Sequence, residues 1–176
     1  MNTMNKFAAE TALIKGVVTD TPSWSNQTLK AWDENNFREK EAFVSEKYWS
    51  GQHSINVFDV VGTAHPDYQG LSWLEFLAQG KRMRQNLLLQ EQNPSYYLVE
   101  DIKQPTMFYI EIDGGGWYVN GDGNHRTCIA RFMFHGMGKT MLHGVNVETY
   151  RTDIAAYAAF NRLREVALKH RLPIIV

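Results

Sequence analysis

The order of strand-like and helix-like segments in the second half of the chain limits the possible folds most strongly. TMFYIEID (106–113) has the apolar, β-branched and aromatic character of a strand, and DGGG (113–116) predicts a tight turn into WYVN (117–120). Such a turn joins antiparallel neighbours, so the two strands form a hairpin. Helix-like segments follow at 124–136 and 153–170, with one strand between them. This order predicts an α+β fold rather than a doubly wound sheet.

The first fifty residues differ in character from the segments that follow. MNKFAAETALIKG (4–16) predicts a helix that ends at Gly16, and NNFREKEAFVSEKYW (35–49) predicts a second helix. We therefore expect residues 1–50 to form an N-terminal helical arm and residues 51–176 to form the main domain.

The middle of the chain supplies two more strands and a helix. INVFDVVG (55–62) and SYYLVEDI (95–102) are rich in β-branched and aromatic residues, which favours strands. LSWLEFLAQGKRMRQNLLLQ (71–90) has a helical pattern that is interrupted or joined at Gly80. Strands and helices therefore alternate here as they do in the second half.

The composition restricts the kinds of partner. Hydrophobic residues make up 44% of the chain and charged residues 21%, so the chain can bury a core and is not disordered. The formal net charge is -1, so contact with nucleic acid requires a local basic patch. KRMR (81–84) is a candidate for such a patch, and its alternative is a solvated helix end.

The cysteine content and the apolar runs bear on the compartment. The single cysteine, Cys128, excludes a disulfide framework and agrees with a reducing compartment. No apolar run approaches the roughly 20 residues that a membrane helix needs, and the first residues lack the apolar core of a secretory signal. We therefore expect a cytoplasmic protein without membrane insertion.

The segment NGDGNHR (120–126) marks a change from strand to helix through two glycines. The first backbone N–H groups of a helix have no partner within the helix, and the helix dipole adds partial positive charge there. Such a helix start attracts phosphate or carboxylate groups. Gly121 and Gly123 allow a ligand to approach the main chain closely, and the helix begins near Asn124.

Three side chains in this turn are candidates for chemistry. Arg126 offers the paired donors that suit phosphate, and His125 offers a second donor or a base. Asp122 could hold a metal ion that bridges two phosphates. The alternative is an ordinary capped turn, in which Asp122 or Asn124 caps the helix while His125 and Arg126 are solvated. The spacing alone leaves both interpretations open.

Two further carboxylates could join a magnesium site. Glu111 and Asp113 flank Ile112 on the predicted strand, so both project from one face. Together with Asp122 they could bind Mg²⁺. The alternative is the solvated face of a strand.

The stretch NGDGNHRTCIARFMFHGMG (120–138) resembles the ParB/sulfiredoxin superfamily, in which a strand, a glycine turn, a His-Arg or Arg-Arg pair and a helix follow one another. That superfamily includes partition proteins, sulfiredoxin and nucleotide-dependent serine kinases. The resemblance implies a mixed sheet with flanking helices and a turn that grips the phosphates of ATP or CTP with Mg²⁺.

The resemblance continues to FNRLRE (160–165), which looks like the second motif of the partition proteins, Glu-Asn-x-x-Arg. It covers roughly residues 100–170. The cofactor-binding residues that it implies are Gly121, Gly123, Asn124, Arg126, Thr127, Asn161 and Arg164. It implies Asp122 and Glu111 as candidate metal ligands.

Two positions depart from the family pattern. Asn124 stands where sulfiredoxin has its reactive cysteine, and Cys128 lies one helical turn further on. Reduction of a sulfinic acid is therefore not expected. Phe160 stands where the partition proteins begin the second motif with an acid, so a carboxylate that could organise Mg²⁺ is missing.

A narrower resemblance is to small plasmid-borne fertility-inhibition or oncogenic-suppression proteins. It implies a nucleotide-binding phosphohydrolase, an ATPase and a DNase, that suppresses DNA transfer between cells and is recruited by a protein of the transfer machinery. Its catalytic residues would be His125, Arg126 and Asp122. The alternatives are a non-catalytic protein-docking regulator and a nucleotide-dependent serine kinase.

Overall fold

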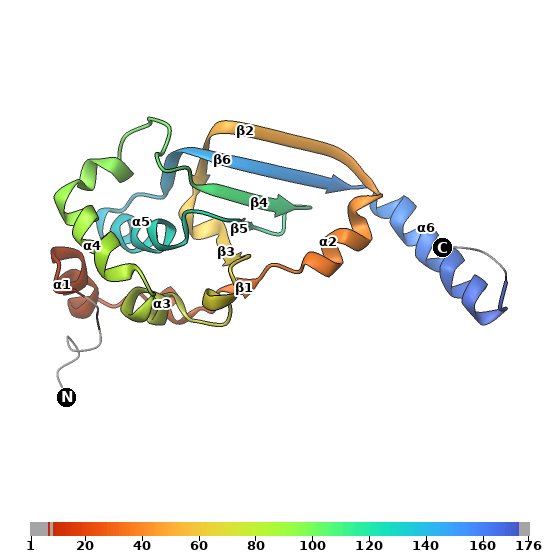
Figure 1. The fold of residues 1–176 in the computed structure, drawn as a ribbon, viewed down its shortest axis with the longest axis horizontal. Helices are drawn as coiled ribbons and strands as arrows, with labels where there is room; N and C mark the ends of the chain where they lie inside the picture. Colours follow the sequence, from red (N-terminus) through yellow and green to blue (C-terminus); the bar gives the residue numbers. More distant parts are fainter. Residues whose placement is uncertain (1–6, 8, 173–176) are drawn as a thin grey trace.

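The protein is an α+β molecule built on one mixed sheet of six strands (Figure 1). The structure is a computed structural model that describes residue 7 and residues 9–172. The strands are β1 (Lys30–Ala31), β2 (Val44–Asn56), β3 (Val60–Thr63), β4 (Phe108–Ile112), β5 (Trp117–Val119) and β6 (Met141–Thr152). The helices are α1 (Ala12–Thr19), α2 (Glu34–Glu41), α3 (Trp73–Gln79), α4 (Met83–Gln92), α5 (Asn124–Met137) and α6 (Ile154–Lys169).

The strand order is β1-β3-β5-β4-β6-β2. Strand β3 runs parallel to both β1 and β5, and β4 runs parallel to β6. The hairpin pair β4–β5 and the long edge pair β2–β6 are antiparallel. The parallel pairing of β3 with β5 matters for function, because the carboxyl ends of these two strands meet at one edge of the sheet.

Helix α5 packs against one face of the sheet and is itself covered by other helices. Its buried residues include Cys128, Ile129, Phe132 and Phe134. Helices α1, α3 and α4 pack on its outer side (Figure 1), and α3 contributes the buried Trp73. The core therefore lies between the sheet and α5 and continues outward under the covering helices.

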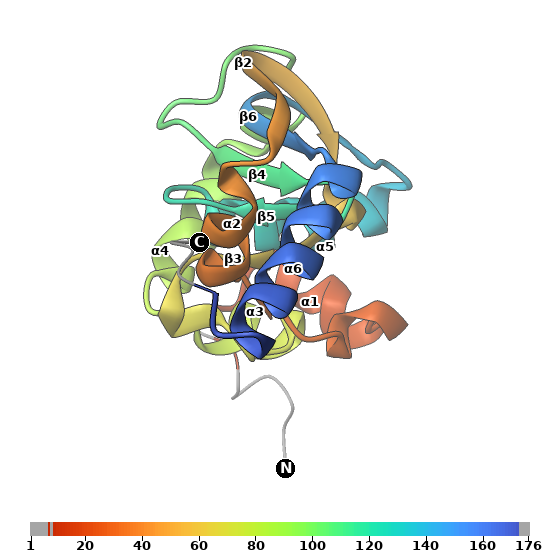
Figure 2. The ribbon, with the colours of Figure 1, turned by 90° about the vertical axis from the view of Figure 1, so that its right-hand side faces the viewer.

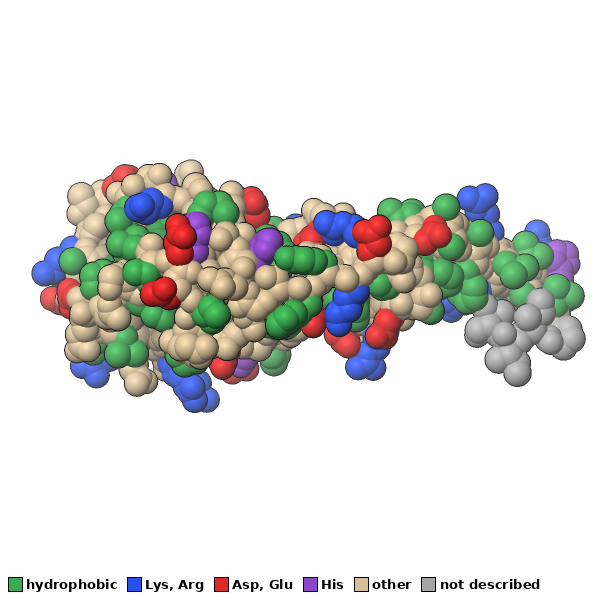
Figure 3. All heavy atoms as spheres, turned by 90° about the horizontal axis from the view of Figure 1, so that it is seen from above, with side chains coloured by type: hydrophobic (Ala, Val, Ile, Leu, Met, Phe, Trp, Pro, Cys, Tyr) green, Lys and Arg blue, Asp and Glu red, His purple; other side chains and the backbone are tan. Residues whose placement is uncertain are grey.

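Helices α2 and α6 lie at the end of the sheet where β2 begins and β6 ends (Figures 1 and 2). The ring of Phe43 packs against Tyr157 at 5.4 Å and Phe160 at 5.1 Å between ring centroids, which holds the first half of α6. The rest of α6 projects from the body. Figure 3 shows the resulting elongated outline, with hydrophobic side chains exposed along that end.

Several predicted elements are confirmed. The turn at 113–116 joins β4 to β5 in the predicted hairpin, and α5 and β6 follow in the predicted order. Asp153 caps α6, because its carboxylate accepts a hydrogen bond from the Ala156 N–H at 2.9 Å. Helices α3 and α4 meet at Gly80, as the interrupted pattern predicted.

Two helix predictions in the first fifty residues were wrong in their extent. Helix α1 continues past Gly16 to Thr19, and the part of the predicted 4–16 helix at residues 4–6 and 8 lies outside the described residues. The predicted 35–49 helix stops at Glu41, and β2 begins at Val44. No residue of α2 is buried, so pairing of β2 with β6 overrides a weak helical pattern.

Two strand predictions were also wrong. Pro94–Tyr97 forms a 3₁₀ turn within the predicted 95–102 strand. Strand β4 already has β5 on one side and β6 on the other, so no edge is free there for another strand. The predicted 55–62 strand is divided by a 3₁₀ turn, where the Asn56 side chain accepts a hydrogen bond from the Phe58 N–H at 3.0 Å.

The N-terminal fifty residues are part of the main body rather than a separate helical arm. Ile14, Val17 and Leu29 lie in the same core as α5 and the sheet. The predicted boundary at residue 50 falls inside β2, which spans Val44–Asn56. The arm-like part of the structure is α6, at the other end of the chain.

One buried cation connects these layers. The guanidinium of Arg131, on α5, lies 4.7 Å from the ring centre of Trp24 and 4.5 Å from that of Trp73. It donates to the carbonyls of Val57 at 3.2 Å and Val60 at 2.8 Å. Burial lowers the pKa of Arg131 to about 10, so the side chain stays charged at neutral pH.

We expect Arg131→Met to lower the free energy of unfolding by about 3 kcal/mol, because it removes charged hydrogen bonds and leaves buried carbonyls without their donor. Urea unfolding measures the change. The control is Arg38→Met, at an exposed pair on α2, where the change should stay within about 0.5 kcal/mol. Equal effects of the two substitutions would contradict the role given to Arg131.

Candidate functional site

The candidate site is the turn where β5 ends and α5 begins, beside the end of β3. Gly121 and Gly123 have φ values of 92° and 115°, a region that favours glycine. No side chain caps the first turn of α5. A Cβ added at Gly121 would meet no heavy atom within 4 Å, so the space beside this residue is open. The predicted junction therefore exists, with an uncapped helix start next to open space.

Buried side chains fix the shape of the turn. The Asn124 side chain accepts a hydrogen bond from the Thr63 hydroxyl at 2.6 Å and donates to the Gly121 carbonyl at 3.0 Å. The Thr127 hydroxyl donates to the Gly123 carbonyl at 2.8 Å and lies 2.7 Å from the Tyr109 hydroxyl. These two predicted cofactor-binding side chains thus hold the turn together, which leaves their backbone N–H groups as the groups for a ligand.

His125 is packed into the body rather than solvated. Its ring lies 5.2 Å from both the Tyr68 and the Phe76 ring centres. The backbone N–H of Arg82 donates to Nε2 of His125 at 3.3 Å. Burial, with a smaller contribution from the nearby charges of Arg82, His65 and Arg126, lowers the pKa of His125 to about 4. The ring is therefore neutral at pH 7, with its proton on Nδ1.

The pKa of His125 gives the fold a sensitivity to acid. The unfolded ring, with an ordinary pKa of 6.5, binds a proton more readily than the folded ring, with a pKa of about 4. The contribution to stability is therefore fully present above pH 6.5 and is lost as the pH falls toward 4. We expect His125→Asn, which keeps an acceptor and does not titrate in this range, to reduce the loss of stability between pH 7.5 and pH 4.5.

Urea midpoints at the two pH values measure this effect, with His170→Asn at an exposed position as the control. An unchanged pH dependence in His125→Asn, with the control unchanged as well, would contradict the assigned protonation.

Arg126 is also bound by the protein itself. Its guanidinium donates to the Tyr96 hydroxyl at 2.6 Å, to the Thr106 carbonyl at 3.0 Å and to the Pro105 carbonyl. It thereby anchors the loop that leads into β4. It also lines a cavity of about 190 Å³ together with Tyr96 and Tyr97. The role that the structure gives to the Arg126 side chain is to position this loop.

Sequence reasoning placed the cations of the 81–84 segment in a separate patch, but Arg82 adjoins the turn. The charge of Arg82 contributes to the lowered pKa of His125, so its guanidinium lies close to the ring. Lys81, Arg82 and Arg84 line a shallow hollow of about 410 Å³ along the start of α4. Thr63 was not predicted either, because its partner Asn124 is 61 positions away in the sequence.

The predicted magnesium ligands do not come together. Asp122 precedes α5 and its carbonyl accepts from the Phe108 N–H at 3.2 Å, at the start of β4. Glu111 lies near the other end of β4, where Nη1 of Arg151 contacts its carboxylate at 3.0 and 3.1 Å. Asp113 accepts from the Thr152 N–H at 2.8 Å. Within residues 7 and 9–172, no three His, Cys, Asp or Glu side chains converge as metal ligands.

The second predicted motif is also remote from the turn. Asn161 and Arg164 lie on α6, which projects from the opposite end of the sheet (Figure 1). The structure therefore brings together Gly121, Asp122, Gly123, Asn124 and His125, and it separates them from Asn161, Arg164 and Glu111.

Cys128 is enclosed in the core. Its thiol is fully buried and donates to the Trp73 carbonyl at 3.6 Å, and burial raises its pKa. We expect the native thiol to react with Ellman's reagent at least about 100-fold more slowly than the thiol in urea. Cys128→Ser should keep any phosphate release by the folded protein. Loss of turnover in a folded Cys128→Ser protein would point instead to a chemical role.

No protein-family model, curated protein or solved structure matches the chain. Among the helices that the structure describes, none combines the length and the apolar character that crossing a membrane requires.

Proposed function

We propose that the protein is a nucleotide-binding phosphohydrolase that holds the phosphates of ATP or CTP at the start of α5. The observation that carries the proposal is the uncapped first turn of α5, between Gly121 with open space beside it and the carboxyl ends of the parallel strands β3 and β5. Unpaired N–H groups and the helix dipole favour phosphate at such a place. The resemblance of NGDGNHR to the ParB/sulfiredoxin superfamily supports the same assignment.

The residues around the turn have distinct tasks in this proposal. Backbone N–H groups of the first turn of α5 hold the phosphate oxygens, and the Arg82 guanidinium adds positive charge beside them. The neutral His125 keeps its Nε2 occupied by the Arg82 N–H, so it offers a proton from Nδ1 rather than acting as a base there. The Arg126 side chain supports the turn from the loop side.

The residues present fit a nucleotide-bound Mg²⁺. Magnesium sites of this kind use one or two carboxylates, with water and substrate phosphates as the other ligands. Asp122 is exposed beside the turn, and its carboxylate has no hydrogen-bond or ion-pair partner among the described residues. When bound there, the ion would neutralise charge on the phosphates during attack by water. Glu111 is committed to Arg151 and has no part in this site.

The basic hollow at Lys81, Arg82 and Arg84 favours a second candidate activity, cleavage of DNA at the same turn. A nucleic-acid backbone could follow these three cations up to His125. A serine kinase would use the same phosphate site with a different acceptor. A docking regulator without catalysis is favoured by the internal hydrogen bonds of His125 and Arg126. Suppression of DNA transfer, with recruitment by a transfer-machinery protein, is the biological role that the resemblance implies.

We expect Arg82→Ala to weaken nucleotide binding about tenfold, which corresponds to about 1.4 kcal/mol, because it removes a cation beside the phosphates. We expect Asp122→Ala to abolish the Mg²⁺-dependent part of phosphate release while binding without Mg²⁺ persists. Calorimetry with ATP and CTP measures the first, and phosphate release measures the second. Lys139→Ala, an exposed cation beyond the other end of α5, is the matched control for charge.

The acceptor distinguishes the candidate activities. Phosphate release in buffer alone supports the hydrolase, release that depends on DNA supports the second candidate, and formation of phosphoserine supports the kinase. Nucleotide binding without turnover leaves the regulator. If wild type binds neither ATP nor CTP, the proposed function is wrong.

A further inference from the structure

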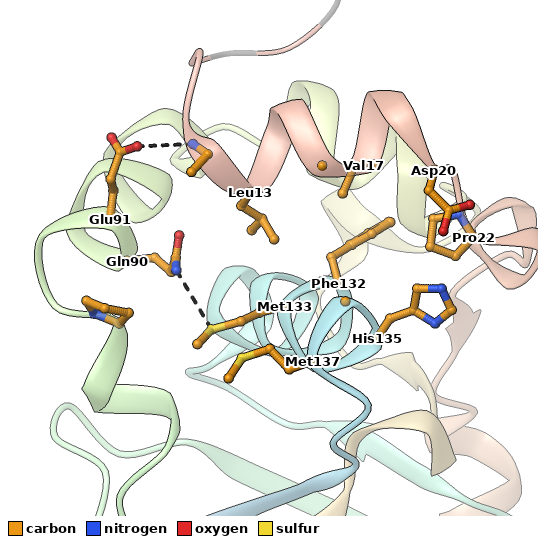
Figure 4. A pocket seen from close by; sticks show the side chains of 14 residues that line it. Leu13, Val17, Asp20, Pro22, Gln90, Glu91, Phe132, Met133, His135 and Met137 are labelled. Carbon is orange, nitrogen blue, oxygen red and sulfur yellow. Dashed lines mark hydrogen bonds between the residues drawn. The ribbon is translucent and has the colours of Figure 1, made fainter.

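An apolar groove lies between α1, α4 and the last turns of α5, on the outer side of the body. Its volume is about 440 Å³, within the range of sites that accept apolar ligands or side chains. Figure 4 shows Leu13 and Val17 facing Phe132 and Met133 across it. The groove is therefore a hollow between packed helices and not a gap between loops.

Two glycines make the groove deep. Gly16 lies within α1 and Gly136 within α5, and neither has a positive φ that would require glycine. A Cβ added at either position would meet no heavy atom within 4 Å. Glycine inside a helix lowers its stability by about 1 kcal/mol relative to alanine, so these positions trade helix stability for empty space.

The rim of the groove is acidic. Asp20 stands at the C-terminal end of α1, and Glu91 stands at the other end, where its carboxylate accepts from the Ala12 N–H at 3.1 Å. Figure 4 shows the two carboxylates at opposite ends of the groove, with His135 beside Asp20. Neither lysine nor arginine lines it among the described residues. An occupant should therefore be apolar in the middle and basic at two points.

Helix α6 has these properties. Leu163 is 56% exposed and Val166 is 49% exposed, and with Ala159 they recur at the spacing of four and three that places side chains on one face of a helix. Arg162 and Lys169 flank that face, seven residues apart. A helix of 16 residues is marginal alone in water, so this face needs a partner.

The dimensions of helix and groove agree. Arg162 and Lys169 are about 10.5 Å apart along the α6 axis, and Asp20 and Glu91 flank the ends of α1, whose 8 residues span about 12 Å. The two basic groups can therefore reach the two acids while Leu163 and Val166 enter the hollow. Helices bind grooves with anchors at this spacing in many recognition complexes.

We propose that α6 of one copy of this chain docks into the α1–α4–α5 groove of a second copy. The groove and α6 lie at opposite ends of one molecule (Figure 1), so a chain does not fill its own groove in this conformation. The contact is therefore head-to-tail. Contacts of this type continue from copy to copy and give rings or filaments instead of closed two-fold dimers.

Two variants remove opposite halves of this contact. Gly16→Phe fills the groove, and it should not disrupt folding because the added Cβ meets nothing and phenylalanine suits a helix better than glycine. The double substitution Leu163→Asp and Val166→Asp places charge on the docking face of α6. Leu168→Asp is the matched control, because Leu168 is 70% exposed on another side of the same helix.

Sedimentation velocity over a range of concentrations measures association, and circular dichroism verifies that each variant is folded. We expect wild type and Leu168→Asp to form dimers and larger species, whereas Gly16→Phe alone and the double α6 variant alone stay monomeric. A mixture of these two variants should form dimers and nothing larger, since each supplies the half that the other has lost.

Three results would overturn the proposal. Wild type could stay monomeric at all concentrations, in which case another molecule covers α6. Gly16→Phe could associate as wild type does, which would mean that α6 pairs with itself. The mixture could stay monomeric although each variant is folded. None of these results depends on nucleotide, so the proposed function is tested separately.

Discussion

The arrangement of the body depends on the buried guanidinium of Arg131. A charged group inside a protein must recover in contacts what it loses in hydration, and the rings of Trp24 and Trp73 and the carbonyls of Val57 and Val60 supply those contacts. These partners belong to the N-terminal segment, to α3 and to the turn before β3. One side chain of α5 thereby fixes the helix to three parts of the chain that are distant in sequence, and with it the direction in which α5 begins.

The start of α5 is held equally firmly. The hydrogen bonds from Thr63 to Asn124 and from Asn124 to the Gly121 carbonyl join the end of β3 to the glycine turn. His125 and Arg126 then fasten the turn to α4 and to the loop before β4. A ligand at this place would meet N–H groups that are already oriented, which lowers the entropy lost on binding. The side chains that look catalytic in the sequence contribute this rigidity.

The local part of the fold could be predicted from the sequence, and the long-range part could not. The DGGG turn, the Asp153 cap and the break at Gly80 depend on neighbouring residues, and all three are confirmed. The change from α2 to β2 depends on pairing with β6, more than 90 positions later, which no local pattern reveals. The same limit applies to the site. The glycine turn was visible in the sequence, whereas the contacts of Glu111 with Arg151 and of Arg126 with Thr106 arise only when the chain folds.

The single attachment of α6 has a mechanical consequence. The helix is held near its beginning, where Tyr157 and Phe160 meet Phe43, and its remaining turns extend freely from that joint (Figure 2). Its 16 residues form a lever about 24 Å long, so a rotation of about 10° at the joint would carry the tip through about 4 Å. Small changes in the packing of three aromatic rings are thus amplified into a large sweep at the far end of the molecule.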